Sequence, residues 1–186
     1  MRKNFGAKPL SCPQPVWIIA TYGEDGTPDA MNAAWGGIAD FKELVICLSS
    51  GHKTVKNILQ RKAFTVSMAT ADQITACDYV GLVSANDVKN KFEKAGFHAV
   101  KSEFVDAPLI AELPLAIECT LKSYDPESGL LFANIINVGA DESVLDEKGN
   151  LDMGKLRPIS FDPFNNAYLG FGEKVANAFT EGRKLK

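Results

Sequence analysis

The sequence lacks the charge excess and the long apolar runs that would place it on nucleic acid or in a membrane. Its formal net charge is -3, and no basic stripe of the kind that follows a phosphate backbone is present. No apolar run approaches the roughly 20 residues that a spanning helix needs. Residues 1–10 also lack the apolar core of a signal peptide. We therefore expect a cytoplasmic protein without nucleic-acid or membrane partners.

The common catalytic and metal-binding motifs are also missing. The four cysteines are neither paired as C-x-x-C nor grouped with either of the two histidines, so we predict no metal site and expect buried or free thiols. No G-x-S-x-G indicates a hydrolase. Gly170-Phe171-Gly172 begins like a dinucleotide fingerprint, but Val175 stands where its third glycine should be. We therefore assign no catalytic side chain.

What the sequence does contain is the pattern of a small β-rich domain. With 186 residues, 46% hydrophobic and 23% charged, the chain is predicted to form one domain over residues 1–186. Runs rich in β-branched and aromatic residues, separated by turn signals, predict strands at residues 16–22, 28–35, 44–48, 64–68, 115–121 and 130–136. The continuous apolar run at 44–48 predicts a strand buried on both faces, whereas the alternation at 64–68 predicts a half-buried one.

Short helices are predicted between these strands. Residues 52–61 carry apolar side chains at helical spacing, and residues 86–95 end at Gly96, a natural left-handed cap. A further helix is predicted near residues 173–179. The polar, acidic stretch 139–154 is predicted to be a loop. The fold class is therefore mainly β with helical insertions, most simply a β-barrel.

The segment from Leu48 to Val55 has the composition of an anion site. A buried strand ends in Ser49, Ser50 and a glycine, and a helix that carries Lys53 and Thr54 begins at once. A helix N-terminus offers free N–H groups, and hydroxyls and a lysine add donors and positive charge. The alternative is that Ser50 only caps the helix while Lys53 points into solvent.

A second candidate segment runs from Met31 to Gly37. The small residues Ala33 and Ala34 let backbone N–H groups approach a flat ligand, with Trp35 as a wall and Asn32 as a donor and acceptor. The alternative is a core tryptophan beside a glycine bulge.

Taken together, the order of several short motifs resembles the flavin reductase-like family, and within it the flavoredoxin-type members. The resemblance covers nearly the whole chain and rests on M-N-A-A-W at 31–35, S-S-G-H-K-T-V-K-N-I at 49–58, F-T-V-S-M-A-T at 64–70, D-Y-V-G-L-V-S at 78–84, N-K-F at 90–92 and A-P-L-I at 107–110. It implies a split β-barrel of Greek-key type, a homodimer, and FMN bound at or near the subunit interface.

The resemblance also implies roles for individual residues. Ser49, Lys53 and Thr54 would hold the FMN phosphate, and Asn32, Ala33 and Trp35 would line the isoalloxazine, with the N–H groups near Ala34 facing the ring. Lys91 would reach the flavin or its phosphate, and Phe164 would lie against the ring, unless the first is a solvated helix lysine and the second a core anchor. Leu130 departs from the family pattern, in which a histidine often opens this strand.

Three functions remain open on the sequence. The first is an NAD(P)H-dependent flavin oxidoreductase, in which NADH or NADPH reduces the bound FMN. The second is a flavoredoxin-like electron carrier that exchanges electrons only with protein partners. The third is a β-barrel without flavin. The sequence does not separate the first two, because a nicotinamide site in such a fold is made largely by shape.

Overall fold

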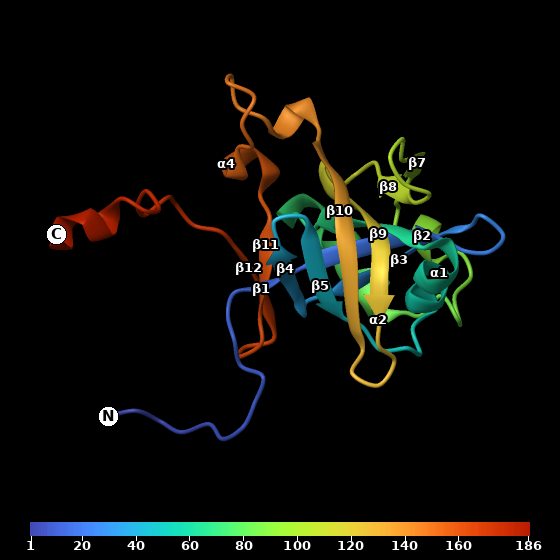
Figure 1. The fold of residues 1–186 in the computed structure, drawn as a ribbon, viewed down its shortest axis with the longest axis horizontal. Helices are drawn as coiled ribbons and strands as arrows, with labels where there is room; N and C mark the ends of the chain where they lie inside the picture. Colours follow the sequence, from blue (N-terminus) through green and yellow to red (C-terminus); the bar gives the residue numbers. More distant parts are fainter.

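The computed structural model describes residues 1–186, and its largest element is one strongly curled antiparallel sheet (Figure 1). The sheet has seven strands in the order β3-β2-β6-β9-β10-β5-β4. Their bounds are β2 Trp17–Tyr22, β3 Pro28–Ala33, β4 Gly36–Asp40, β5 Glu43–Cys47, β6 Ala63–Met68, β9 Leu115–Tyr124 and β10 Leu130–Ala140. The mainly β fold with helical insertions is as predicted.

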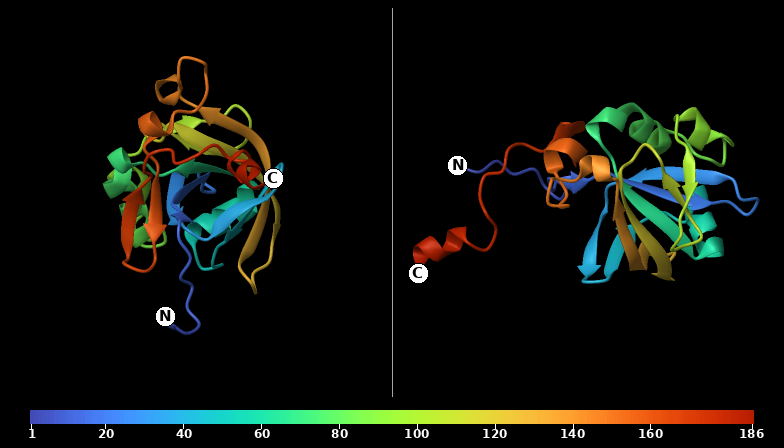
Figure 2. Two further views of the ribbon diagram at one scale, coloured as in Figure 1. Left: turned by 90° about the vertical axis from the view of Figure 1, so that its left-hand side faces the viewer. Right: turned by 90° about the horizontal axis from the view of Figure 1, so that it is seen from above.

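Smaller elements surround this sheet. The helices are α1 Lys53–Arg61, α2 Ile74–Leu82, α3 Lys91–Lys94 and α4 Met153–Leu156, with 3-10 turns η1 Ala71–Gln73, η2 Glu142–Val144 and η3 Glu181–Leu185. Strands β1 Gln14–Pro15, β11 Ile159–Asp162 and β12 Ala167–Gly170 form a second sheet, and β7 Ala99–Lys101 pairs with β8 Pro108–Ile110. Both chain ends extend from the side of the body that carries β1, β11 and β12 (Figure 2). None of the helices is both long and apolar enough to span a membrane.

The curled sheet has a separate apolar core on each face. The inner core joins alternate residues of the strands to Val55 and Ile58 of α1, so this helix fills the concave side. The second core joins the other face of β2 to α2 through Cys77 and Val80 and to Phe92 of α3. Two cores explain why β2, which contributes to both, is buried at all but its last residue.

The burial predicted for two strands is reversed in the structure. In β5, Leu44 and Ile46 are buried while Val45 and Cys47 are only half-buried, because this strand is next to the sheet edge and has a core on one face alone. β6, predicted to be half-buried, is buried at every residue but its last. It lies between β2 and β9, and Thr65 on its outer face donates a hydrogen bond to the carbonyl of Pro108 (2.6 Å).

The helix predictions had mixed outcomes. α1 lies at the predicted position, but the helix predicted at 86–95 is only the four-residue α3 after a series of turns. Gly96 does have the positive φ of 83° expected after it. Residues 173–179 form no helix, and the 3-10 turn η3 begins only at Glu181. α2 was missed, because its residues are apolar on several sides and show little helical periodicity.

Candidate functional site

A cavity of about 400 Å³ opens where the C-terminal ends of β3, β5 and α2 meet the N-terminus of α1. These elements come from four separate parts of the chain, which the curled sheet brings to one place. The lining consists of Met31, Asn32, Ala33, Ala34, Trp35, Cys47, Leu48, His52, Lys53, Thr54, Val80, Gly81, Leu82, Val83, Ser84, Ala85 and Lys91. Seven of the ten residues predicted from the sequence are therefore brought together here.

One end of the cavity is the N-terminus of α1. The N-cap residue His52 makes no side-chain cap, and the first turn carries no acidic residue. Lys56 is the first residue of the helix whose N–H is bonded, to the carbonyl of His52 (3.3 Å). The N–H groups of the first three helical residues, 53–55, are therefore free. Free N–H groups at the positive end of the helix dipole, beside the Lys53 ammonium, form a site for an anion. Because His52 is the N-cap, the alternative of a capping Ser50 is wrong.

A buried ion pair forms the wall between α1 and α3. Lys91 is only 3% exposed, and its Nζ lies 3.2 Å from Oδ1 of Asp29. The same ammonium donates to the carbonyl of Val83 (3.3 Å), while the Thr54 hydroxyl donates to Oδ2 of Asp29 (2.6 Å). Lys91 is therefore not a solvated helix lysine. Asp29, which the sequence did not single out, holds two of the cavity's polar side chains in place.

The end of β3 packs tightly against α2 on the other side of the cavity. Asn32 donates from Nδ2 to the carbonyl of Cys77 (3.2 Å). A Cβ atom on Gly81 would lie 2.9 Å from Cβ of Asn32, so this position requires glycine. Because its side-chain amide is bonded to α2, Asn32 fixes the position of the β3 backbone. The backbone of the next residues, Ala33 and Ala34, then borders the cavity.

Trp35 stands at the rim of the cavity and is 58% exposed. The alternative of a core tryptophan beside a glycine bulge is therefore wrong for this residue. The core position belongs to Trp17, whose ring would lie 2.6 Å from a Cβ atom on Gly36, so this glycine lets the chain pass over the indole. An exposed indole beside a cavity is available to a flat ligand.

Three predicted residues do not line the cavity of this chain. Ser49 and Ser50 are exposed in the turn before α1, and their side chains make no cap or hydrogen bond that ties them to it. Phe164 is 52% exposed and packs edge-on against Phe5 with ring centroids 6.4 Å apart. It is therefore not a core anchor, and within one chain it lies apart from the predicted ring region.

Part of the lining was not predicted. Residues 80–84, at the end of α2 and in the following turn, were noted only as part of a motif of the resemblance, and Ala85 was not noted as a site residue. Cys47 and Leu48 were assigned to a buried strand, yet both reach the cavity. Leu130, the departure from the family pattern, pairs with Cys47 across β10 and β5, which places the altered position beside the lining. These residues carry no polar motif that could have marked them.

Comparison with known proteins agrees with this arrangement. A family model described as the flavin reductase like domain matches residues 10–160. The chain belongs to the flavin reductase-like family. Its structure is similar to the flavoredoxin of Desulfovibrio vulgaris (Miyazaki F), with 34% identity, a TM-score of 0.93, and coverage of 98% of this chain and 100% of the other. The split-barrel fold predicted from the resemblance is confirmed.

Other solved structures share the fold at lower identity. The flavoredoxin of Methanosarcina acetivorans is 23% identical, with a TM-score of 0.88 and full coverage of both chains. The FMN-binding domain of a flavin reductase-like enzyme from Shewanella baltica OS155 is also 23% identical, with a TM-score of 0.78 and coverage of 88% of this chain and 89% of the other. Among curated sequences, an uncharacterized protein of Aquifex aeolicus is 29% identical over 159 residues, which is 81% of each chain.

Proposed function

We propose that this protein binds FMN in the cavity between β3, α1 and α2 and transfers electrons through it. The observation that carries the proposal is the first turn of α1, which has no side-chain cap and no acidic residue and opens into the cavity beside Lys53. A phosphate monoester fits such a site, because it accepts hydrogen bonds from free N–H groups and carries charge opposite to the helix dipole and the lysine.

The remaining lining residues suit the rest of an FMN molecule. The backbone of Asn32, Ala33 and Ala34 and the indole of Trp35 would line the isoalloxazine, and N–H groups near Ala34 would face its polar edge. Thr54 would contribute its backbone N–H, since its hydroxyl already donates to Asp29. This changes the role expected for Thr54 from the sequence, which was a hydroxyl contact to the phosphate.

Lys91 is proposed to contact the flavin as well. Its ammonium donates a hydrogen bond to the carbonyl of Val83 and forms an ion pair with Asp29, and the residue lines the cavity. An ammonium fixed by these two contacts still has hydrogens that it can donate to a ligand. Because Asp29 offsets the positive charge of Lys91, Lys91 would act mainly as a hydrogen-bond donor to the ligand. Lys53 would then supply most of the positive charge of the site.

FMN would supply the redox chemistry when bound, taking up reducing equivalents from a donor and passing them to an acceptor. The protein's part is to hold the phosphate at α1, to orient the ring against β3 and to leave one face open at the Trp35 rim. No acid or base side chain is required, which agrees with the apolar lining contributed by α2.

Two versions of this function are supported by different observations. The open rim at Trp35 favours an oxidoreductase that admits NADH or NADPH. The 34% identity to a flavoredoxin favours an electron carrier that exchanges electrons with a protein partner. We further propose a homodimer, because β4 and β10 expose large apolar side chains such as Ile38 and Val138. The four free cysteines suit a reducing cytoplasm.

The deciding measurement is an absorbance spectrum of the purified protein with added FMN, followed by NADH, NADPH and then dithionite. Bound flavin that bleaches with a nicotinamide supports the oxidoreductase, and bound flavin that bleaches only with dithionite supports the carrier.

Lys53→Met should weaken FMN binding about 10- to 100-fold, the scale of a lost hydrogen bond to a charged group. Lys56→Met, an exposed lysine of the same helix outside the cavity, is the matched control. If the native protein does not bind FMN, the proposal is wrong.

A further inference from the structure

A chain of polar contacts connects β12, in the second sheet, to the cavity. The hydroxyl of Tyr168 on β12 donates to Oδ1 of Asp78 on α2 (2.7 Å). The preceding residue of α2, Cys77, accepts the hydrogen bond from Nδ2 of Asn32, and Asn32 lines the cavity. Tyr168 and Asp78 themselves do not line it. They are therefore placed to act on the cavity only through Asn32.

The ring of Tyr168 holds its hydroxyl at a fixed place. Tyr168 is paired with Phe161 of β11, and the two ring centroids are 6.2 Å apart. Both rings pack against the core that contains Cys77 and Val80 of α2. Burial and the hydrogen bond to Asp78 raise the pKa of Tyr168 to about 12. The hydroxyl therefore stays protonated near neutral pH and remains a donor to Asp78.

The partners of the Asn32 amide determine which way it faces. A backbone carbonyl only accepts, so the amide atom facing the carbonyl of Cys77 must be the nitrogen. The hydroxyl hydrogen of Tyr168 is directed to Asp78, so its oxygen also presents lone pairs. Asn32 acts on this oxygen as a hydrogen-bond donor and so lowers the pKa of Tyr168, against the larger effects that raise it. Both neighbours therefore favour Nδ2 on their side.

The oxygen of the same amide is free for a ligand. Oδ1 of Asn32 accepts no hydrogen bond within the protein, and it is not fully buried. The α2 side of the residue is closed, because a Cβ atom on Gly81 would lie 2.9 Å from Cβ and 3.7 Å from Nδ2 of Asn32. Asn32 is therefore expected to offer the cavity an acceptor alone, which narrows the donor and acceptor role expected from the sequence.

An acceptor of fixed direction selects an N–H group of the flavin ring. The isoalloxazine carries a hydrogen on N3 in both redox states, whereas N5 gains one only on reduction. Its ring carbonyls accept hydrogen bonds and are not partners for Oδ1. A bond to N3–H would strengthen the binding of oxidised and reduced FMN alike. A bond to N5–H would strengthen only the binding of reduced FMN and would raise the midpoint potential.

We propose that Asn32 directs its side-chain oxygen to an N–H group of the flavin ring, and that Tyr168 and Asp78 are positioning residues that keep the amide from turning over. This rests on the proposed function, since the ring is that of the FMN assigned to the cavity. A reversed amide would place Oδ1 against the carbonyl of Cys77, where two acceptors would meet without a hydrogen between them.

The first test compares the affinity of the full-length protein and of Asn32→Leu for oxidised and reduced FMN. If the partner is N3–H, both affinities should fall about tenfold, the scale of one hydrogen bond, and the midpoint potential should not change. If the partner is N5–H, only the affinity for reduced FMN should fall tenfold. The midpoint potential should then decrease by about 30 mV, which is the equivalent of tenfold for two electrons.

Variants of the positioning residues separate this role from a merely structural one. Tyr168→Phe keeps the ring against Phe161 and removes only the hydroxyl. It should repeat the redox pattern of Asn32→Leu at about three- to fivefold, because the amide keeps one of its two partners. Asp78→Asn still accepts from Tyr168 and should retain the native values, whereas Asp78→Leu should resemble Tyr168→Phe. Tyr79→Phe is the matched control, because its hydroxyl makes no hydrogen bond within the protein and lies outside the cavity.

A second measurement needs no flavin. In NMR spectra of the flavin-free protein, Tyr168→Phe should shift the side-chain N–H signals of Asn32 and speed their exchange with solvent. Tyr79→Phe should leave these signals in place. This readout reports the orientation of the amide directly, whatever the protein binds.

The proposal fails if Tyr168→Phe binds oxidised and reduced FMN as tightly as the native protein, even where its stability is lower. It also fails if the Asn32 signals are the same in Tyr168→Phe and in the native protein. A native protein that does not bind FMN counts against the proposed function instead. The NMR comparison then still decides whether Tyr168 fixes the Asn32 amide.

Discussion

Two ion pairs of nearly equal length occupy opposite environments in this molecule. Lys91 and Asp29 are 3.2 Å apart, with side chains only 3% and 7% exposed. Arg61 and Asp106 are 3.3 Å apart, with side chains 26% and 59% exposed. Distance alone would rank the pairs equally. Their surroundings rank them differently. Losing one partner of a buried pair is far more costly than losing one partner of a pair that solvent screens.

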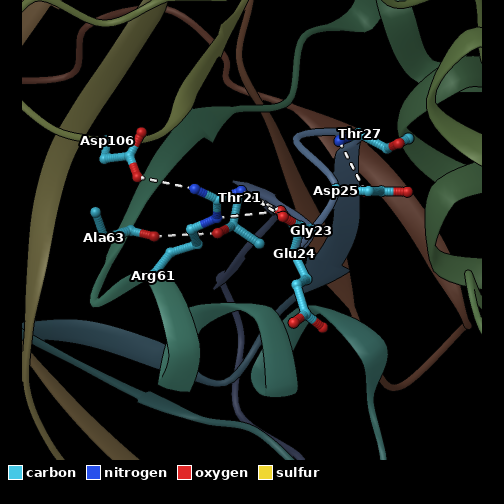
Figure 3. Close-up of polar contacts among 8 residues, drawn as sticks. All are labelled: Thr21, Gly23, Glu24, Asp25, Thr27, Arg61, Ala63 and Asp106. Atoms are coloured by element: carbon cyan, nitrogen blue, oxygen red, sulfur yellow. Dashed lines mark hydrogen bonds and ion pairs between the residues drawn. The ribbon is translucent and has the colours of Figure 1, made fainter.

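The other partners of each pair show the same difference. Around the buried pair, the Thr54 hydroxyl donates to Asp29 and the Val83 carbonyl accepts from Lys91, which replaces part of what solvent would otherwise supply. In the exposed pair, Arg61 makes its shorter contacts to backbone carbonyls of the β2–β3 turn, and Asp106 adds little (Figure 3). The buried network therefore joins β3, α1 and α3 at the cavity, whereas Arg61 fastens a single turn.

The largest expected effect follows from removing one partner of the buried pair. Lys91→Met leaves the Asp29 carboxylate without its counter-ion in a buried position. The free energy of unfolding of the flavin-free protein should fall by about 3–5 kcal/mol. Urea denaturation followed by circular dichroism measures this loss.

A double variant provides the control for this prediction. Asp29→Asn combined with Lys91→Met replaces the ion pair by a neutral amide and an apolar chain of similar size, and it should recover much of the loss, because no charge remains buried alone. Equal instability of the single and double variants would mean that lost packing, and not the unpaired charge, causes the effect.

A smaller effect is expected at the second partner of Asp29. Thr54→Val keeps the shape of the side chain and removes the hydroxyl that donates to Oδ2 of Asp29. Stability should fall by about 1–3 kcal/mol, the cost of an unmet buried acceptor. The affinity for FMN should change little if Thr54 acts through its backbone N–H. A large loss of FMN affinity with little loss of stability would instead assign the hydroxyl to the ligand.

A still smaller loss of stability is expected when the exposed contacts of Arg61 are removed. Arg61→Met removes the bonds to the carbonyls of Gly23 and Glu24, which solvent can partly replace, so stability should fall by only about 1–2 kcal/mol. Thermal unfolding measures this loss, with Lys56→Met as a control on the same helix.

How far the sequence could predict these features depends on whether neighbours along the chain determine them. The six predicted strands, the β2–β3 turn and α1 follow from local patterns, and so does the proposed anion site at the start of α1, whereas β4, β7, β8, β11 and β12 were not predicted. The burial of β5 and β6 was reversed, because it depends on strand order and on what covers the far face of the sheet, where Thr65 of β6 bonds to Pro108 of β8. A strand's own residues do not reveal which neighbours will cover it.

The residues of the candidate site also differ in whether the sequence could predict them. Lys53 and Trp35 could be selected from their local motifs, and Lys91 from a family resemblance. Asp29 could not, because it reads as an ordinary turn-to-strand residue until α1 and α3 bring Thr54 and Lys91 to its two carboxylate oxygens. Phe164 was selected by resemblance alone, and it lies beside Phe5 rather than at the cavity.

The weakest predicted effect isolates the exposed pair itself. Asp106→Asn removes the charge facing Arg61 but leaves the arginine's bonds to the turn carbonyls intact, so stability should change by only about 0–1 kcal/mol. That small difference should shrink further in high salt, because the pair is open to screening ions, whereas the loss in Lys91→Met should persist. Denaturation of both variants in low and high salt makes this comparison. If Asp106→Asn cost as much as Lys91→Met, burial would not be what distinguishes the two pairs, and the central role assigned to Asp29 at the cavity would lose its physical basis.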